Sequence, residues 1–199
     1  MFDSLNTILS GDVANFATVV ALVAVAEIGD KTQLLSLLLV AKFRRPWTIM
    51  AGILFATLLN HALAAWAGLW LEHFVKPEYL RWALGVSFIA MAIWTLKPDT
   101  LDESDAPVKA SRFGAFTGTL VAFFLAEIGD KTQVATTALA AKYSSLWLVA
   151  SASTLGLMLA NVPVLLMGEA IMRRVPLDLV RKIAALAFAV IGVITLIGW

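Results

Sequence analysis

The chain has 199 residues, of which 60% are hydrophobic and 15% are charged, and its net charge is +1. Soluble domains carry about 25% charged residues, so this composition favours a membrane protein, and the small net charge gives no indication of a nucleic-acid partner. The absence of cysteine excludes disulfides, thiolate metal sites and cysteine nucleophiles.

Long apolar segments follow one another along the whole chain. Each supplies the roughly 20 residues that a helix needs to cross about 30 Å of hydrocarbon, and a lone segment can satisfy its backbone hydrogen bonds there only as a helix. The first and fourth are long enough to be tilted or broken. We predict an all-α polytopic membrane protein with six transmembrane helices, over residues 13–41, 47–72, 79–96, 113–141, 146–172 and 177–198.

Basic residues are unevenly distributed between the two sides of such a bundle. The segments after the first, third and fifth apolar runs hold ten of them: Lys42, Arg44, Arg45, Lys97, Lys109, Arg112, Arg173, Arg174, Arg181 and Lys182. The opposite side holds three: Lys76, Arg81 and Lys142. By the positive-inside rule, the side with ten is cytoplasmic. We therefore expect both termini to lie on the opposite side of the membrane, outside the cytoplasm.

The octapeptide Ala-Glu-Ile-Gly-Asp-Lys-Thr-Gln occurs twice, at 26–33 and 126–133. Because eight identical residues recur at an offset of 100, we interpret the chain as two copies of a repeated unit. Residues 1–98 form the predicted first unit, 99–112 an acidic cytoplasmic linker, and 113–199 the second unit.

Each predicted unit contains three spans, and three is an odd number. The two units must therefore insert in opposite directions, as in the inverted repeats of secondary transporters, whose substrate sites lie near the bilayer midplane. Each octapeptide begins about 14 residues into its span, or roughly 20 Å along a helix. Both copies are thus expected to reach one depth from opposite sides.

The octapeptide places charged residues where the bilayer would be. A charge at the bilayer centre costs at least about 2.5–3.5 kcal/mol on insertion scales, so such residues face one another or water. A helix that continues through the motif places Glu27, Asp30 and Lys31 on one face, and Thr32 then points away unless Gly29 breaks the helix. The same holds for the second copy, with Glu127, Asp130, Lys131 and Thr132.

Four carboxylates and two ammonium groups leave a formal charge of −2, which a divalent cation would neutralise. Carboxylate, amide and hydroxyl oxygens suit hard cations such as Ca²⁺, Mg²⁺ or Mn²⁺. The candidate ligands are Glu27, Asp30, Glu127, Asp130, Gln33, Gln133, Asn60 and Asn161, with Lys31, Lys131, Thr32 and Thr132 in coupling or ion-pairing roles.

Simpler interpretations of these residues stand beside that one. Glu27–Lys31 and Glu127–Lys131 could be structural ion pairs, although both aspartates would then remain uncompensated. Asn60 and Asn161 could instead form hydrogen bonds between helices. His61 has no counterpart in the second half, where Val162 follows Asn161, and we favour packing or contact with water over a ligand role.

The twin Glu-x-Gly-Asp-Lys-Thr motifs, at 27–32 and 127–132, resemble those of the bacterial manganese-exporter (MneA-like) family, which is related to the eukaryotic Golgi calcium/manganese:proton antiporters. The resemblance covers essentially the whole chain and implies a cation exchanger that exports Mn²⁺. Manganese and the direction of transport come from this resemblance. A Ca²⁺/H⁺ antiporter of the same architecture is the alternative that stays open.

Protons and a metal ion would compete for the same carboxylates, which is the basis of antiport. We expect no permanent cofactor, transported Mn²⁺ or Ca²⁺ together with H⁺, a lipid bilayer around the protein and no nucleic-acid partner; a homodimer is left open.

A cation channel would use the same acidic residues without proton coupling, and a small-molecule exporter would not need the doubled motif. An enzyme is disfavoured because the chain lacks His-Glu-x-x-His and Gly-x-Ser-x-Gly.

Overall fold

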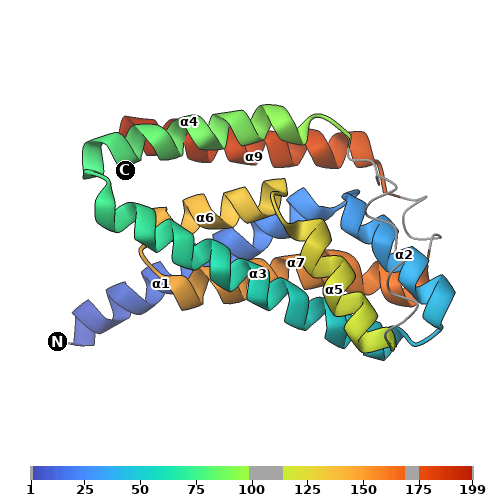
Figure 1. Cartoon of the computed structure of the whole chain (residues 1–199). Helices are drawn as coiled ribbons and strands as arrows, with labels where there is room; N and C mark the ends of the chain where they lie inside the picture. The colour runs from blue at the N-terminus through green and yellow to red at the C-terminus, as the bar shows by residue number, and fades with distance from the viewer. Residues whose placement is uncertain (1, 99–113, 169–174, 199) are drawn as a thin grey trace.

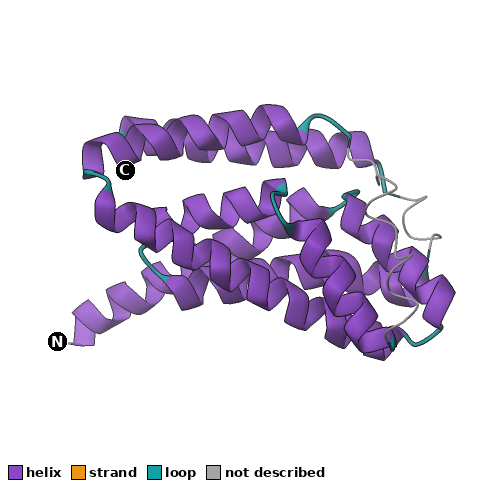
Figure 2. Ribbon diagram, in the orientation of Figure 1, coloured by secondary structure: helices purple, strands orange, loops and turns teal. Residues whose placement is uncertain are grey.

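A computed structural model of the chain describes residues 2–98, 114–168 and 175–198, with side chains from Gly11 onward. The regular structure in these ranges is entirely helical (Figure 2). The helices are α1 (Phe2–Glu27), α2 (Lys31–Phe43), α3 (Pro46–Phe74), α4 (Pro77–Thr95), α5 (Ala115–Glu127), α6 (Lys131–Tyr143), α7 (Leu146–Met167) and α9 (Leu177–Ile197). The linker predicted at 99–112 falls outside the described residues.

The predicted apolar segments correspond to these helices, with two breaks. The first segment is split into α1 and α2, and the fourth into α5 and α6. By length and composition, three helices in the described part of the chain can each cross a membrane: α3, α7 and α9. The α1–α2 pair, which bends by 69°, makes a fourth if it counts as one span. The chain is therefore an all-α polytopic membrane protein.

The two halves repeat the same local structure. α2 and α6 both have 13 residues, and both begin at an aspartate that caps the helix. Both end at a left-handed residue, Arg44 with φ +52° and Ser144 with φ +51°, which turns the chain directly into a long helix. Pro46 then occupies the first turn of α3, where a missing N–H costs nothing.

The halves are interleaved rather than placed side by side. α1 packs along α7, α5 packs along α3, and α3 and α7 contact each other (Figure 1). α4 and α9 form a separate pair along one side of the bundle, and each contributes a fully buried phenylalanine, Phe88 and Phe188. The four-helix centre therefore contains elements from both halves.

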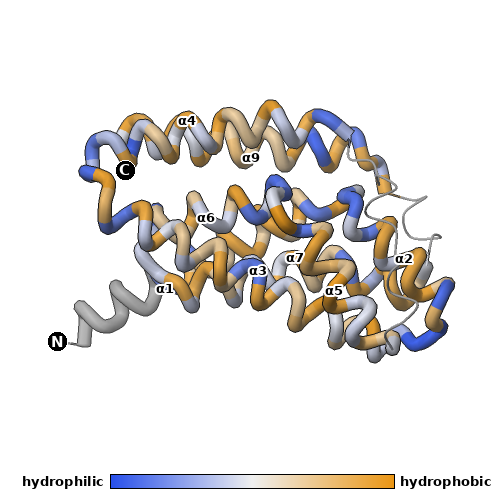
Figure 3. The backbone as a smooth tube through the Cα atoms, viewed as in Figure 1, coloured by the Kyte–Doolittle hydropathy of each residue, from blue (hydrophilic) through white to orange (hydrophobic). Residues whose placement is uncertain are grey.

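Corresponding elements of the two halves run in opposite directions through the bundle (Figure 1). α1 begins and α9 ends at the same end of the bundle, as an even number of crossings would produce. Hydrophilic positions gather at the ends of the bundle and at the two breaks inside it (Figure 3). The division into units 1–98 and 113–199 stays a prediction, but the breaks put the polar octapeptides together in the interior.

Candidate cation-binding site

The first octapeptide ends one helix and starts the next. α1 ends at Glu27, and Gly29 has φ +81°, a left-handed conformation that glycine adopts without strain. Asp30 then caps α2 by accepting a hydrogen bond from the Thr32 backbone N–H at 3.3 Å. The prediction of one continuous helical face through the motif is therefore wrong, and the stated exception, a break at Gly29, is what occurs.

The second octapeptide repeats this geometry closely. α5 ends at Glu127, Gly129 has φ +74°, and Asp130 accepts the Thr132 backbone N–H at 3.2 Å. In both copies the aspartate N–H donates to the glutamate carbonyl, at 3.1 and 3.2 Å. The same sequence thus forms the same broken turn at two places that converge in space.

The break redirects the threonine side chains. Thr32 Oγ1 lies 2.9 Å from Glu27 Oε2 and 3.4 Å from Asp30 Oδ2, and Thr132 Oγ1 makes the matching contacts at 3.4 and 3.1 Å. The expectation that Thr32 points away held only for an unbroken helix. Each hydroxyl instead donates toward the carboxylates of its own motif and fixes their orientation.

The two glutamines brace the breaks. Gln33 Oε1 accepts the Gly29 N–H at 2.8 Å, and Gln133 Oε1 accepts the Gly129 N–H at 2.7 Å. Gln33 Nε2 also donates to the Ala160 carbonyl of α7 at 2.8 Å. Because both amide oxygens bond to their own backbone, the structure does not bring these two candidate ligands to the carboxylates.

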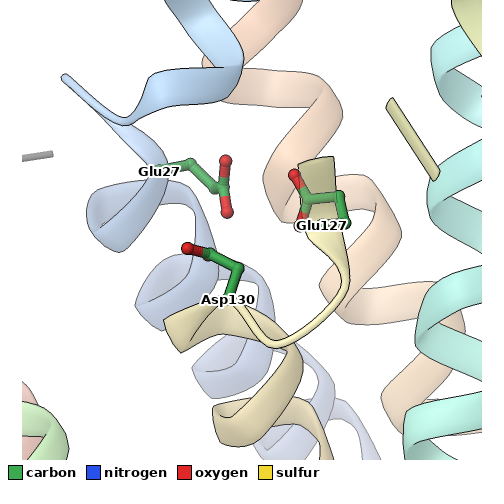
Figure 4. Close-up of side chains that lie close together, drawn as sticks. All are labelled: Glu27, Glu127 and Asp130. Carbon is green, nitrogen blue, oxygen red and sulfur yellow. The ribbon is translucent and has the colours of Figure 1, made fainter. Parts of the chain in front are cut away.

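Three carboxylates from the two halves meet in the interior. Glu27 from the end of α1 faces Glu127 from the end of α5 and Asp130 from the start of α6 (Figure 4). One oxygen from each lies within 4.8 Å of the others, and all three residues are at least 96% buried. Oxygens on opposite sides of a divalent cation lie about 4–5 Å apart, given bond lengths of about 2.0–2.6 Å. The cluster therefore has the size of a cation site.

Two oxygens of this cluster are buried without a hydrogen bond. Glu27 Oε1 and Glu127 Oε1 contact no donor in the described part of the chain. A buried carboxylate oxygen without a partner is costly, and clustered carboxylates repel one another. A bound cation would remove both penalties.

The fourth carboxylate is held differently. Asp30 Oδ1 lies 2.6 Å from Lys131 Nζ, and both side chains are almost completely buried. This ion pair joins the first octapeptide to the second, whereas the simpler interpretation expected pairs within each motif. Lys31 is half-buried and forms no ion pair with any described residue. The two lysines of the repeat therefore have unequal surroundings.

The two asparagines bond to neighbouring helices. Asn60 Nδ2 donates to the Phe124 carbonyl at 3.0 Å, in the last turn of α5, and its Oδ1 has no hydrogen bond within the described ranges. Asn161 Oδ1 instead accepts the Ser36 hydroxyl at 2.8 Å. Sequence reasoning missed Ser36, although a hydroxyl recurs at the matching position of the repeat, Thr136.

His61 is fully buried between α3 and α7. Its Nδ1 lies 3.5 Å from Thr154 Oγ1, and its Nε2 has no hydrogen bond to the residues described. This placement agrees with packing rather than with contact to water. His61 does not belong to the carboxylate cluster.

Similarity to known proteins places the chain in a family. A 175-residue stretch is 49% identical to a Vibrio cholerae protein named "Putative manganese exporter" and covers 87% of this chain and 86% of that protein. A GDT1-like protein of Synechocystis is 23% identical over 202 residues, covering 90% of this chain and 95% of that protein. No solved structure matches the chain. The family model described as "Divalent cation/proton antiporter GDT1" matches residues 15–103 and 115–199, and the chain therefore belongs to the GDT1 family of divalent cation/proton antiporters.

Proposed function

We propose that this protein exports Mn²⁺ in exchange for protons and that Glu27, Glu127 and Asp130 bind both. The observation that carries the proposal is the buried cluster of these three carboxylates, with two unbonded oxygens, at the junction of the two halves. The name of the Vibrio cholerae relative, which is 49% identical, supports manganese as the ion and export as the direction.

The chemistry of exchange follows from the ligand type. Carboxylate oxygens bind hard divalent cations well, and the same oxygens bind protons. Because the site is buried, an empty and fully ionised cluster is unfavourable. The cluster therefore holds either a metal ion or protons, and loading one releases the other. This competition couples the two fluxes without any covalent step.

Asp30 has a supporting role in this proposal. Its pairing with Lys131 neutralises one carboxylate and leaves three for the ion. Thr32 and Thr132 orient the carboxylates by donating hydrogen bonds to them. All three proposed ligands come from a single chain, so the proposed site forms without residues of a second copy.

The proposed topology is six spans in two inverted units. α4 and the broken pair α5–α6 supply the two spans beyond those that length and composition alone support. With the side that holds ten basic residues in the cytoplasm, both termini are outside a bacterial inner membrane. Movement of one half's elements against the other's would expose the central cluster to alternate sides, as in other inverted-repeat transporters.

Flux into proteoliposomes tests the proposal. Mn²⁺ and Ca²⁺ uptake should be measured with and without an imposed pH gradient, for the wild type, Glu27→Gln, Glu127→Gln and the double variant. Glu72→Gln is the matched control, because Glu72 bonds to Ser144 far from the cluster. We expect Mn²⁺ flux that follows the pH gradient and disappears in the double variant.

Three results would contradict specific parts of the proposal. Proton-coupled flux that survives in the double variant would exclude the cluster as the site. Flux that ignores the pH gradient would indicate a channel. A strong preference for Ca²⁺ would replace manganese with the alternative ion of the same architecture.

A further inference from the structure

The two glutamines of the repeat make the same local bond in different surroundings. Gln33 is 2% exposed and also donates from Nε2 to the Ala160 carbonyl on α7. Gln133 is half-buried, and the described residues offer its Nε2 no acceptor. Only the first break is therefore tied by its glutamine to a helix of the other half.

A small cavity of about 120 Å³ lies beside Gln33. Its walls include Ile28 and Gln33 from the break, Ala160, Pro163 and Val164 from α7, and Leu177 from the start of α9. The volume accommodates a few water molecules. The cavity extends from the break toward the end of the bundle where α7 ends and α9 begins.

The break segment separates this cavity from the carboxylates. Ile28 and Gln33 line the cavity, while their chain neighbours Glu27 and Thr32 are hydrogen-bonded to each other at the cluster. Movement of the chain at the break would therefore connect the two spaces.

Among the described residues, a side chain covers the first break but not the second. A Cβ placed on Gly29 would lie 2.9 Å from Leu177 Cδ2, whereas a Cβ on Gly129 would have no atom of the described residues within 4 Å. The two breaks therefore share a backbone geometry but differ in their described surroundings.

Proline weakens α7 at the place where Gln33 attaches. Pro163 lies inside α7 and has no N–H, so the Leu159 carbonyl lacks its usual helical donor. Counted from the paired asparagines, the first half has Ala62 at the matching position. The asymmetry of the two breaks is thus present in the sequence as well as in the contacts.

We infer that Gln33 is a gating residue: its bond to the Ala160 carbonyl holds the first break against α7 and closes the route between this cavity and the carboxylate cluster. The inference rests on the proposed function, because a gate has meaning only on an ion path. It gives Gln33 a positioning role in place of the ligand role. In the proposed orientation the cavity is the cytoplasmic approach to the site.

The absence of cysteine makes the gate testable by labelling. Val164→Cys places one thiol on the cavity wall, at a residue that is 3% exposed. Its reaction rate with a small charged thiosulfonate is measured in proteoliposomes for Gln33→Met and, as the matched control, Gln133→Met. Both substitutions remove the bond to a glycine N–H, but only Gln33→Met removes the bond to α7.

The expected result is a labelling rate about three- to tenfold higher in Gln33→Met than in Gln133→Met, which is the population shift that one lost hydrogen bond produces. Equal rates in the two variants would overturn the inference. Gln33→Leu is the second labelling variant in case the methionine variant does not fold. Its side chain has no donor for the Ala160 carbonyl, so it should also label faster.

Mn²⁺ affinity separates a gate from a ligand. If Gln33 is a gating residue, the Mn²⁺ dissociation constant of both labelling variants of Gln33 should stay within about threefold of wild type, and Mn²⁺ should exchange faster. A ligand predicts at least tenfold weaker binding in Gln33→Met and recovery in Gln33→Glu, and that pattern would overturn the inference. The labelling readout needs no transported ion. Unaltered Mn²⁺ binding in Glu127→Gln would therefore refute the proposed function and leave the labelling result intact.

Discussion

Lys131 Nζ lies 2.6 Å from Asp30 Oδ1, and this buried ion pair joins the second octapeptide to the first. It neutralises one of the four motif carboxylates without using a cation from solvent. The pair also joins elements of the two predicted halves, which move against each other in the proposed transport cycle. Its strength therefore bears on both folding and transport.

Removing Lys131 should destabilise the protein strongly. Lys131→Met leaves Asp30 as a buried charge without this partner, which typically costs about 3–5 kcal/mol. The free energy of unfolding in detergent should fall by that order, while the matched variant Lys31→Met, at a half-buried lysine, changes it far less. Adding Asp30→Asn to Lys131→Met should recover much of the loss. Equal effects of the two lysine variants would contradict this account.

Neutralising Glu127 should have opposite effects on the metal-free and metal-bound protein. Without a metal, the three clustered carboxylates must take up protons or repel one another, so Glu127→Gln lowers this cost and should raise the thermal midpoint of the metal-free form. Wild type should gain about 2.7 kcal/mol at a Mn²⁺ concentration 100 times the dissociation constant, and Glu127→Gln should gain little. Thermal unfolding with and without Mn²⁺ measures both effects, with Glu72→Gln as the control. A variant that keeps the full Mn²⁺ stabilisation would remove Glu127 from the site.

The Thr132 hydroxyl should matter for metal affinity although it need not touch the metal. It lies 3.1 Å from Asp130 Oδ2 and 3.4 Å from Glu127 Oε2, and residues that orient ligands typically change affinity by about 10–100-fold when lost. We expect Thr132→Val to weaken Mn²⁺ binding about tenfold, and Thr132→Ser to restore it. Isothermal titration in detergent provides the measurement. Thr137→Val, which loses only a bond to its own helix, is the control and should bind normally.

Alanine should be tolerated unequally at the two motif glycines. Both have positive φ, +81° at Gly29 and +74° at Gly129, and alanine in this conformation costs about 1–2 kcal/mol. Gly29→Ala also brings its Cβ against Leu177, so it should lower the thermal midpoint more than Gly129→Ala. In a Leu177→Ala background, Gly29→Ala should lower the thermal midpoint by less than it does in the wild type, because the contact with Leu177 is then absent. Equal effects at the two glycines would mean that Leu177 does not cover the first break.

The helices could be predicted from the sequence because hydrocarbon permits few other structures. The segments 47–72 and 79–96 correspond to α3 and α4 within three residues at each end, and the polar residues between apolar runs mark the turns. The doubled octapeptide indicated where the halves meet. The charges of the octapeptides indicated four candidate carboxylates, and the structure brings three of them together, Glu27, Glu127 and Asp130.

The break at Gly29 was harder to predict, because a glycine inside a helix costs only about 1 kcal/mol and is compatible with both conformations. A signal was nevertheless present. An aspartate followed three residues later by glutamine is typical of a capping box at a helix start, as Asp30 and Gln33 are. Reading that pattern would have placed Thr32 at the carboxylates and Gln33 on the backbone.

The partner of Lys131 could not be predicted from spacing. On a continuous helix its natural partner is Glu127, four residues earlier. The break removes that geometry, and the choice of Asp30 depends on how α1–α2 and α5–α6 meet across the bundle. Such contacts depend on how distant segments pack together, and the residue pattern of a single sequence does not reveal this.

One octapeptide with a single backbone geometry occupies two unlike surroundings: the first copy is covered by Leu177 and bonded to α7, and the second has no such cover among the described residues. The motif is thus stable in either setting without refolding. If the two copies exchange surroundings, the protein reaches its reverse state at a cost set by a few side-chain contacts. A transporter of this kind has no intrinsic direction of transport. Net movement would then be decided by the chemical potentials of metal and proton on the two sides, and the same molecule would run backwards when they are inverted.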